Sequence, residues 1–415
     1  MKRIYQNVVS SDVELFIGKE IEKTIFNKQK TLFVANTIPC NLIQKIAYEN
    51  QCEHMKQNLW IIPIEPLDMR YTKQWYENLP ITLSNSLNDI FNVIQIEVPF
   101  ENLYEKPQTG AFFDFAETCN FKSAQAQKIS KMFKNGDIKK NDIFLFTDAW
   151  NPTVHIIRYI SELNQIPVYC TGIWHAGHYD PTDILGFSIQ NKNWIDSFEY
   201  SLANSYDISF FATQHHHDKF KNYFENIFEK IISKLIVCGQ PHEHLFNLQN
   251  NEIKENLVVF PHRLNSDKSP FIFDLIKDNV QKKRPEILFI KTQELNLNKD
   301  EYYKLLKKCK VVFSANKHEN LGIGVVEAMV CGCIPLVPNR LSYQEMYQSI
   351  FKYDYDNVDK YSITLVENLS ERIIYFIDNY YKPILYNNWR SNLLFILNHF
   401  FTCKKMINCL KELKM

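Results

Sequence analysis

The segment His318–Glu345, which reads HENLGIGVVEAMVCGCIPLVPNRLSYQE, is the most informative part of the chain. An apolar run ends at Ser314, and the turn NLGIG then leads into a helical pattern over Val325–Cys331. Glycine lets a backbone approach a ligand closely, and a helix start offers N–H groups and a partial positive charge to an anion. The pattern predicts a strand–turn–helix unit whose turn binds phosphate. Glu319 and Glu327 bracket the turn, eight positions apart, and can reach opposite ends of one ligand.

Short apolar runs alternate with helical patterns on both sides of this segment. Such alternation predicts parallel sheets covered by helices, an α/β fold, with ligands at the carboxyl ends of the strands. The expected strands are Thr31–Asn36, Leu59–Ile64, Asn92–Val98, Asp142–Thr147, Pro167–Gly172, Ile208–Thr213, Leu257–Phe260, Ile287–Lys291, Val311–Ser314 and Ile334–Val337. We expect two Rossmann-like domains with a cleft between them: residues 1–238 form the first, residues 239–256 a linker, and residues 257–370 the second. Residues 371–415 are expected to be helices that complete the second domain and cross back to the first.

Composition excludes several classes of protein. The chain has 415 residues, 45% of them hydrophobic, and only 10 Gly and 16 Pro, which argues against a low-complexity or collagen-like chain. Lys plus Arg equals Asp plus Glu at 47 each, so no global field attracts nucleic acid or membrane. No apolar run has the length of a signal peptide or a membrane span. The 10 scattered cysteines are expected to be reduced and buried, which favours a cytoplasmic protein.

The order H-E-x-x-G-x-x-x-x-E-A-x-x-x-G-x-x-P in the quoted segment resembles the E-x7-E motif of family 4 retaining glycosyltransferases, which have the GT-B fold. Its continuation, PLVPNRLSYQE, is most similar to the branch with tRNA-queuosine mannosyltransferases and some phage-encoded glycosyltransferases. The resemblance implies that Glu319 contacts sugar hydroxyls, that Gly322 and Ile323 meet the diphosphate, and that Glu327 binds the ribose. The alternative is a plain strand–turn–helix with surface carboxylates.

A second segment, VVFPHRLNSDKSPFIF, places Arg263 and Lys268 just after the expected strand Leu257–Phe260. It is similar to the R-x4-K phosphate-binding pair of the same family. Fixed cations there can stabilise the negative charge left on a nucleoside diphosphate without a metal. Two solvated charges in a loop are the other interpretation. Arg263 and Glu319 are closer in sequence than is usual for the family, as if one βα unit were trimmed, so base recognition stays open.

In the first half, GIWHAGHYDP follows an expected strand. The resemblance implies that a histidine of the first domain lies over the donor sugar, and His175 is our candidate; a structural histidine is the alternative. Asp148 either orients an acceptor hydroxyl or caps the helix that begins near Pro152. The residues considered for the acceptor are Asp148, Trp150, His178 and Asp180.

The sequence predicts no metal site. His215, His216 and His217 point in different directions on a helix, and we interpret them as a polar helix start. No D-x-D pair follows a strand. Basic clusters at Lys139–Lys140, Lys282–Arg284 and Lys404–Lys405 are interpreted as solvated faces that still leave room for a polyanionic acceptor.

The sequence thus predicts a metal-independent retaining glycosyltransferase without a resident cofactor. Glu319, His175, Arg263 and Lys268 are the expected catalytic residues, and a UDP- or GDP-sugar is the expected donor. A hydroxylated nucleic-acid base is the expected acceptor, which suggests phage DNA modification or tRNA modification in the cytoplasm, or in the host cytoplasm if the protein is phage-encoded. A lipid or glycan acceptor, or a non-catalytic nucleotide-sugar-binding protein, are the alternatives.

Overall fold

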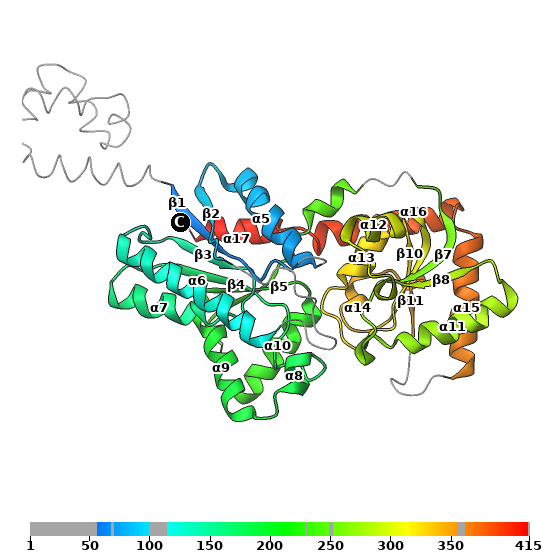
Figure 1. The fold of residues 1–415 in the computed structure, drawn as a ribbon, viewed down its shortest axis with the longest axis horizontal. Coiled ribbons are helices and arrows are strands. Elements are labelled where there is room, and N and C mark those ends of the chain that lie inside the picture. The colour runs from blue at the N-terminus through cyan, green and yellow to red at the C-terminus, as the bar shows by residue number, and fades with distance from the viewer. Residues whose placement is uncertain are drawn as a thin grey trace, which may run out of the picture. The chain divides into compact units, whose positions relative to one another are not determined.

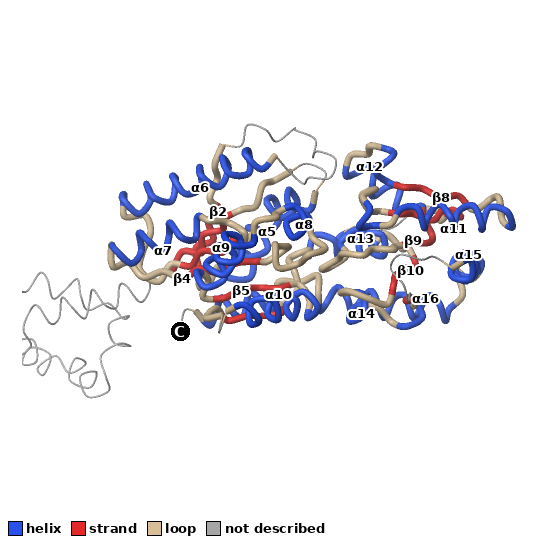
Figure 2. The backbone as a smooth tube through the Cα atoms, turned by 90° about the horizontal axis from the view of Figure 1, so that it is seen from below, coloured by secondary structure: helices blue, strands red, loops and turns tan. Residues whose placement is uncertain are grey.

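A computed structural model of the protein describes residues 56–67, 70–99, 114–228, 231–248, 252–354 and 362–413. Apart from Lys56 and Gln57, these residues fall in one compact unit, Asn58–Met415. The expected strand Thr31–Asn36 lies outside the described residues. Figure 2 shows strands flanked by helices in both halves of the unit.

The first sheet has six strands in the order β2-β1-β3-β4-β5-β6, and the pairs β1–β3, β3–β4, β4–β5 and β5–β6 are parallel. Its strands are β1 (Gln57–Ile62), β2 (Phe91–Gln95), β3 (Ile143–Phe146), β4 (Tyr169–Ile173), β5 (Ile208–Phe211) and β6 (Lys234–Val237). Its helices are α5 (Tyr71–Leu87), α6 (Phe115–Asn135), α7 (Thr153–Leu163), α8 (Ile184–Ser188), α9 (Lys192–Ser205) and α10 (Gln214–Ile227).

Strand β3 shows why this sheet is covered on both faces. All four residues of IFLF are buried. Successive side chains of a strand point to opposite faces, so Phe144 and Phe146 pack with α6, α7, α9 and α10, while Ile143 and Leu145 pack with α5. A continuous apolar run of this kind is typical of a parallel strand between two helical layers.

The second sheet has five parallel strands in the order β11-β10-β9-β7-β8. Its strands are β7 (Glu255–Phe260), β8 (Leu288–Lys291), β9 (Cys309–Phe313), β10 (Ile334–Pro338) and β11 (Lys352–Tyr353). Its helices are α11 (Pro270–Lys283), α12 (Lys299–Lys308), α13 (Ile323–Val330) and α14 (Tyr343–Met346). Short 3-10 turns, η2 (Glu243–Asn247), η3 (Ser266–Lys268), η4 (Thr292–Leu295) and η5 (Ser349–Phe351), join these elements.

The C-terminal helices are α15 (Ile363–Asp378), α16 (Pro383–His399) and α17 (Lys404–Glu412). Helix α15 packs on α11, and α16 packs on α13 and α14. Helix α17, red in Figure 1, packs instead in the core of the first sheet, where Met406 and Leu410 join Leu59 and Phe210. The core of the first sheet therefore contains β1 and α17, which lie at opposite ends of the described sequence.

The predicted α/β class with two parallel sheets is confirmed, and two strands were missed. Edge strand β6 is the short run KLIV, of which only Ile236 is buried, and it leads directly into the polar stretch that was interpreted as a linker. Strand β11 has two residues, too few for a pattern. Within the described residues, no helix has the length and apolarity that a membrane crossing needs. The described cysteines are free, and all except Cys119 are buried.

Candidate functional site

Two neighbouring strands of the second sheet bring the predicted phosphate-binding segments together. Strands β7 and β9 are paired in parallel, so the loops that follow them meet at one edge of the sheet. The loop after β7 carries Arg263 and Lys268, and the loop after β9 carries Glu319 and Gly322. The close approach of these residues therefore follows from the strand order.

Gly322 starts helix α13 with a left-handed backbone, at φ 78°. A Cβ at this position would lie 2.6 Å from Cε1 of Tyr343, so the site admits only glycine without rearrangement. The first N–H groups of a helix have no acceptor within the helix. Here the N–H of Gly322 itself donates to Oε1 of Glu319 at 2.9 Å, while the helix start beyond it, at Ile323, supplies the positive end of the dipole.

The Glu319 carboxylate is held from two sides. Oε1 accepts from Gly322, and Oε2 accepts from Nδ2 of Asn316 at 2.8 Å and lies 3.4 Å from Nζ of Lys268. Burial alone would raise the pKa of Glu319, but Lys268, the nearby histidines His262 and His318, and the Gly322 N–H lower it to about 2. Glu319 is therefore an ionised group in a fixed orientation and a weak base.

Lys268 is the central cation of the site. It is buried, and its Nζ donates to the carbonyl oxygen of His318 at 2.5 Å while lying 3.4 Å from both Asp267 and Glu319. Burial lowers the pKa of Arg263, and the carboxylates of Asp267 and Glu319 oppose that shift. The two predicted phosphate-binding cations therefore share one acidic neighbourhood with Glu319.

Arg70, just before α5, was not foreseen from the sequence. Burial lowers the pKa of its guanidinium to about 10, and the positive charge of Arg263 contributes to that shift. A second guanidinium from the first sheet thus lies within electrostatic range of the Arg263 cation. No local pattern distinguishes Arg70 in RYTKQWYENLP, so only the folded chain identifies it.

Glu327 has other neighbours than Glu319. Its Oε1 accepts from Nζ of Lys299 at 2.5 Å and from the Tyr303 hydroxyl at 2.8 Å, both on α12. Lys299 also lies over the rings of Tyr302 and Tyr303. The structure therefore places Glu327 in a buried ion pair with α12.

His175 follows β4 and faces the neighbouring strand β3. Its Nε2 lies 2.7 Å from the carbonyl oxygen of Thr147; because a carbonyl only accepts, Nε2 carries the proton. Nδ1 is then the acceptor for the Tyr71 hydroxyl at 3.1 Å. Burial lowers the pKa of His175, although Asp148 opposes this. Its carbonyl oxygen accepts from Nδ2 of Asn320 at 2.8 Å, so His175 adjoins the Glu319 loop through its backbone.

Asp148 and Trp150 lie at the carboxyl end of β3. Asp148 accepts from Nζ of Lys122 at 2.8 Å and from the Trp150 N–H at 3.0 Å. Burial would raise the pKa of Asp148, but Lys122 and His175 hold it below its usual range. Asp148 does not cap α7, because Asn151 accepts from the Thr153 N–H instead. Lys122, which the sequence did not single out, is therefore the main partner of this acceptor candidate.

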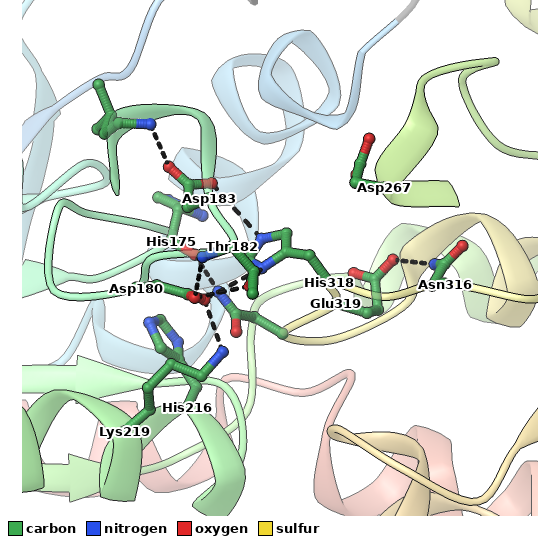
Figure 3. Close-up of polar contacts among 12 residues, drawn as sticks. His175, Asp180, Thr182, Asp183, His216, Lys219, Asp267, Asn316, His318 and Glu319 are labelled. Carbon is green, nitrogen blue, oxygen red and sulfur yellow. Dashed lines mark hydrogen bonds and ion pairs between the residues drawn. The ribbon is translucent and has the colours of Figure 1, made fainter. Parts of the chain in front are cut away.

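His178 and Asp180 have separate surroundings. The His178 ring lies 3.3 Å from Asp196 and 2.5 Å from Nζ of Lys192, within the first sheet's own helices. Asp180 accepts from Nζ of Lys219 at 2.6 Å and lies 3.0 Å from Nδ1 of His318, as Figure 3 shows. Asp180 thus binds a residue of the second sheet's loop, a partner that the sequence did not indicate.

The histidine triplet begins α10, as predicted, but it is not wholly polar surface. His216 is buried and bonds the Tyr179 hydroxyl, while His217 pairs with Asp218 at 2.7 Å. Burial lowers the pKa of His215 to about 4. Among the residues that the structure describes, no group of three or more His, Cys, Asp or Glu side chains could hold a metal ion. In the basic cluster at 282–284, Arg284 pairs with Glu286 and Asp378.

Comparison with known proteins identifies the fold. No family model matches the chain. A tRNA-queuosine alpha-mannosyltransferase of Drosophila melanogaster is 39% identical over 62 residues, which span 15% of this chain and 16% of that enzyme. The chain therefore matches a small part of this curated relative.

Glycosyltransferases are among the solved structures with a similar fold. Sucrose-phosphate synthase from Thermosynechococcus elongatus has a TM-score of 0.55 at 11% identity, over 86% of this chain and 98% of that one. An α,α-trehalose-phosphate synthase (UDP-forming) from Burkholderia vietnamiensis has 0.53 at 9% identity, over 87% and 98%. The pneumococcal O-GlcNAc transferase GtfA in complex with UDP and GlcNAc has 0.51 at 12% identity, over 71% of this chain and 60% of that one. The chain has the GT-B fold that its motifs imply.

Proposed function

We propose that the protein is a retaining glycosyltransferase that moves a sugar from a nucleotide-sugar donor to an acceptor hydroxyl. The observation that carries the proposal is the meeting of Lys268, Glu319 and the Gly322 turn at the start of α13. A buried cation, an ionised carboxylate and a helix start at one point suit a sugar joined to a diphosphate. The UDP and GlcNAc bound by the pneumococcal relative support a donor of this class.

In this proposal the diphosphate lies over the start of α13, held by Arg263, Lys268 and the backbone at Gly322 and Ile323. In the proposal these groups stabilise the negative charge that grows as the sugar–phosphate bond breaks. Arginine offers a planar fork of donors and lysine a point charge, so the pair can serve different phosphate oxygens. The donor is a UDP- or GDP-sugar.

In this proposal Glu319 and His175 face the sugar, and Glu327 binds the ribose. Because the Glu327 side chain is only 5% exposed, ribose binding requires Lys299 to move aside. The low pKa of Glu319 makes it an electrostatic partner for the positive charge that develops on the sugar, rather than a base. We therefore assign the acceptor's proton to the departing phosphate oxygen, with attack on the same face of the sugar, which retains the configuration.

The acceptor enters along the first sheet, where Asp148 and Trp150 follow β3 and Lys122 of α6 pairs with Asp148. The proposed acceptor is a hydroxylated nucleic-acid base, in tRNA or in modified phage DNA, and the short match to the tRNA-queuosine mannosyltransferase supports the tRNA case. A lipid or glycan is the competing acceptor. Mass spectrometry of each candidate acceptor after incubation with a panel of nucleotide sugars decides between them by the added mass.

Substitution of the two proposed diphosphate-binding cations tests the proposal. Arg263→Ala and Lys268→Ala should each reduce donor turnover by about 10²–10³, because each removes one charge-assisted contact to a developing anion. Lys221→Ala is the matched control, since Lys221 is exposed on α10 and pairs with Glu225. The measurement is release of nucleoside diphosphate, with circular dichroism to show that the variants fold. Near-normal turnover in both variants would contradict the assignment, and binding without any turnover would favour a non-catalytic binding protein.

A further inference from the structure

The His318 ring lies between two buried carboxylates of another segment. Its Nδ1 is 3.0 Å from Oδ2 of Asp180, and its Nε2 is 3.5 Å from Oδ2 of Asp183. The side chains of Asp180 and Asp183 are 1% and 4% exposed. Figure 3 shows the ring between them, directly beside Glu319. A ring with a carboxylate at each nitrogen is fixed both in position and in rotation.

Asp180 is itself held rigidly. Its Oδ1 accepts from the Thr182 N–H at 2.9 Å and from the Thr182 hydroxyl at 2.7 Å, and its Oδ2 accepts from Lys219 of α10 at 2.6 Å. Asp183 starts α8 and accepts from the Leu185 N–H at 2.9 Å. The two carboxylates therefore form a preformed seat for His318, built by the loop after β4 and by α10. We call Asp180, Asp183, Lys219 and His318 the clasp.

The clasp is connected to the donor site through the backbone of His318. The His318 carbonyl oxygen is the 2.5 Å acceptor for Nζ of Lys268, and Glu319 is the next residue. On the other side of Glu319, Asn320 donates to His175, and the Asn320 carbonyl oxygen accepts from the Thr213 hydroxyl at 2.9 Å. The first sheet's loops thus hold the residues on both sides of Glu319.

We propose that His318 is a positioning residue: seated between Asp180 and Asp183, it holds its own carbonyl oxygen and Glu319 where Lys268 and the donor sugar need them. This inference rests on the proposed function. In this proposal His318 does not contact the donor; it acts through Lys268 and Glu319. The clasp joins the loops of the two sheets at the proposed donor site. Donor affinity therefore depends on the contact between His318 and Asp180, which the loop after β4 supplies.

Calorimetric binding of UDP and of GDP tests the inference without any transfer step. His318→Gln should weaken the affinity for the nucleotide that the wild-type protein binds by about tenfold, the effect of one lost charge-assisted hydrogen bond. Asp180→Asn should have a similar effect, and the double variant should be no weaker than either single one, because all three break the same contact. His217→Gln is the matched control, since His217 pairs with Asp218 within α10.

Urea unfolding of the same variants separates positioning from a purely structural role. Coupling between His318 and Asp180 in both affinity and stability supports the inference. Coupling in stability with unchanged nucleotide affinity would overturn it, as would additive losses of affinity or a wild-type protein that binds neither nucleotide. Should His318→Gln not fold, Asp183→Asn is measured instead, with an expected loss of about threefold, the smaller effect of the longer contact. A wild-type protein that binds the nucleotide but transfers no sugar would refute the proposed function and leave this inference standing.

Discussion

Glu319 and Glu327 stand eight residues apart in one motif, and their surroundings differ in kind. Glu319 is bound by the Gly322 N–H and lies beside Lys268, one of the two proposed diphosphate-binding cations. Glu327 is paired with Lys299 and Tyr303 on α12, away from that turn. Similar residues in one motif can therefore have separate effects on binding and on chemistry.

Kinetics should separate the two carboxylates. Glu319→Gln should lower kcat more than it changes the donor KM, because it removes a negative charge that stabilises the positive charge developing on the sugar in the transition state. Glu327→Gln should raise the donor KM with a modest loss of kcat, because ribose is bound equally in both states. Both variants are measured at saturating acceptor, with Glu225→Gln, at an exposed position of α10, as the control. A wild-type kcat in Glu319→Gln would refute the sugar-facing role.

At the scale of elements, the start of α13 depends on one glycine and one tyrosine. Tyr343, on α14, packs against Gly322, and its hydroxyl lies 3.2 Å from Nδ2 of Asn316, which in turn binds Glu319. The turn, α14 and the carboxylate are therefore one packed unit. A side chain added at position 322 would disturb all three.

Gly322→Ala should destabilise the protein more than Gly136→Ala. Both glycines have a left-handed backbone, at φ 78° and 74°, which costs about 1–2 kcal/mol for alanine. At Gly136 nothing lies within 4 Å of the added Cβ, whereas at Gly322 Tyr343 must also shift, for a further cost of about 1–3 kcal/mol. Urea unfolding compares the free energies of unfolding, and UDP and GDP binding should weaken in Gly322→Ala alone. Equal destabilisation of the two variants would contradict this, because it would mean that Tyr343 moves away from the added Cβ without a cost in free energy.

At the scale of the whole molecule, buried histidines couple stability to pH. Burial lowers the pKa of His262 to about 3 and of His244 to about 4, and it also lowers that of His216 and His242. The unfolded chain binds these protons near the ordinary pKa of about 6.5, and the folded chain does not. The stability contributed by these groups is therefore complete above about pH 6.5 and is lost as the pH falls toward 4.

The urea concentration at the unfolding midpoint should accordingly decrease as the pH is lowered from 7 to 5. The pKa values of Asp180 and Glu319 are lowered in the folded chain, so the stability that these carboxylates contribute is lost only at more acidic pH, below about 4. His262→Gln should flatten the slope above pH 5, because one of the neutral buried rings is removed. A midpoint that stays constant from pH 7 to pH 5 would contradict this account.

Activity should survive EDTA. In the proposed site Arg263, Lys268 and the α13 helix start carry the charge that a divalent ion supplies in other enzymes. Donor turnover is measured before and after chelation, with a second aliquot given Mg²⁺ in excess. Complete loss that Mg²⁺ restores would show that a metal takes part in the reaction.

Local patterns were enough to predict the α/β class and the strand–turn–helix unit around Gly322. Apolar runs and glycine positions are properties of neighbouring residues, and β7, β9 and α13 lie close to where those patterns place them. Once β7 and β9 pair in parallel, Lys268 and Glu319 must meet at one edge. The strand pattern and a resemblance to known motifs therefore led to the main donor-site candidates.

The partner of each charged group emerged only in the folded chain. Asp180, expected near an acceptor, seats His318; Glu327 pairs with Lys299; and Asp148 pairs with Lys122. The Thr182 hydroxyl contacts the His318 ring beside the clasp, and these two residues are 136 positions apart in sequence. Such contacts depend on how loops from two sheets pack against each other, and no periodicity or spacing within either segment encodes that packing.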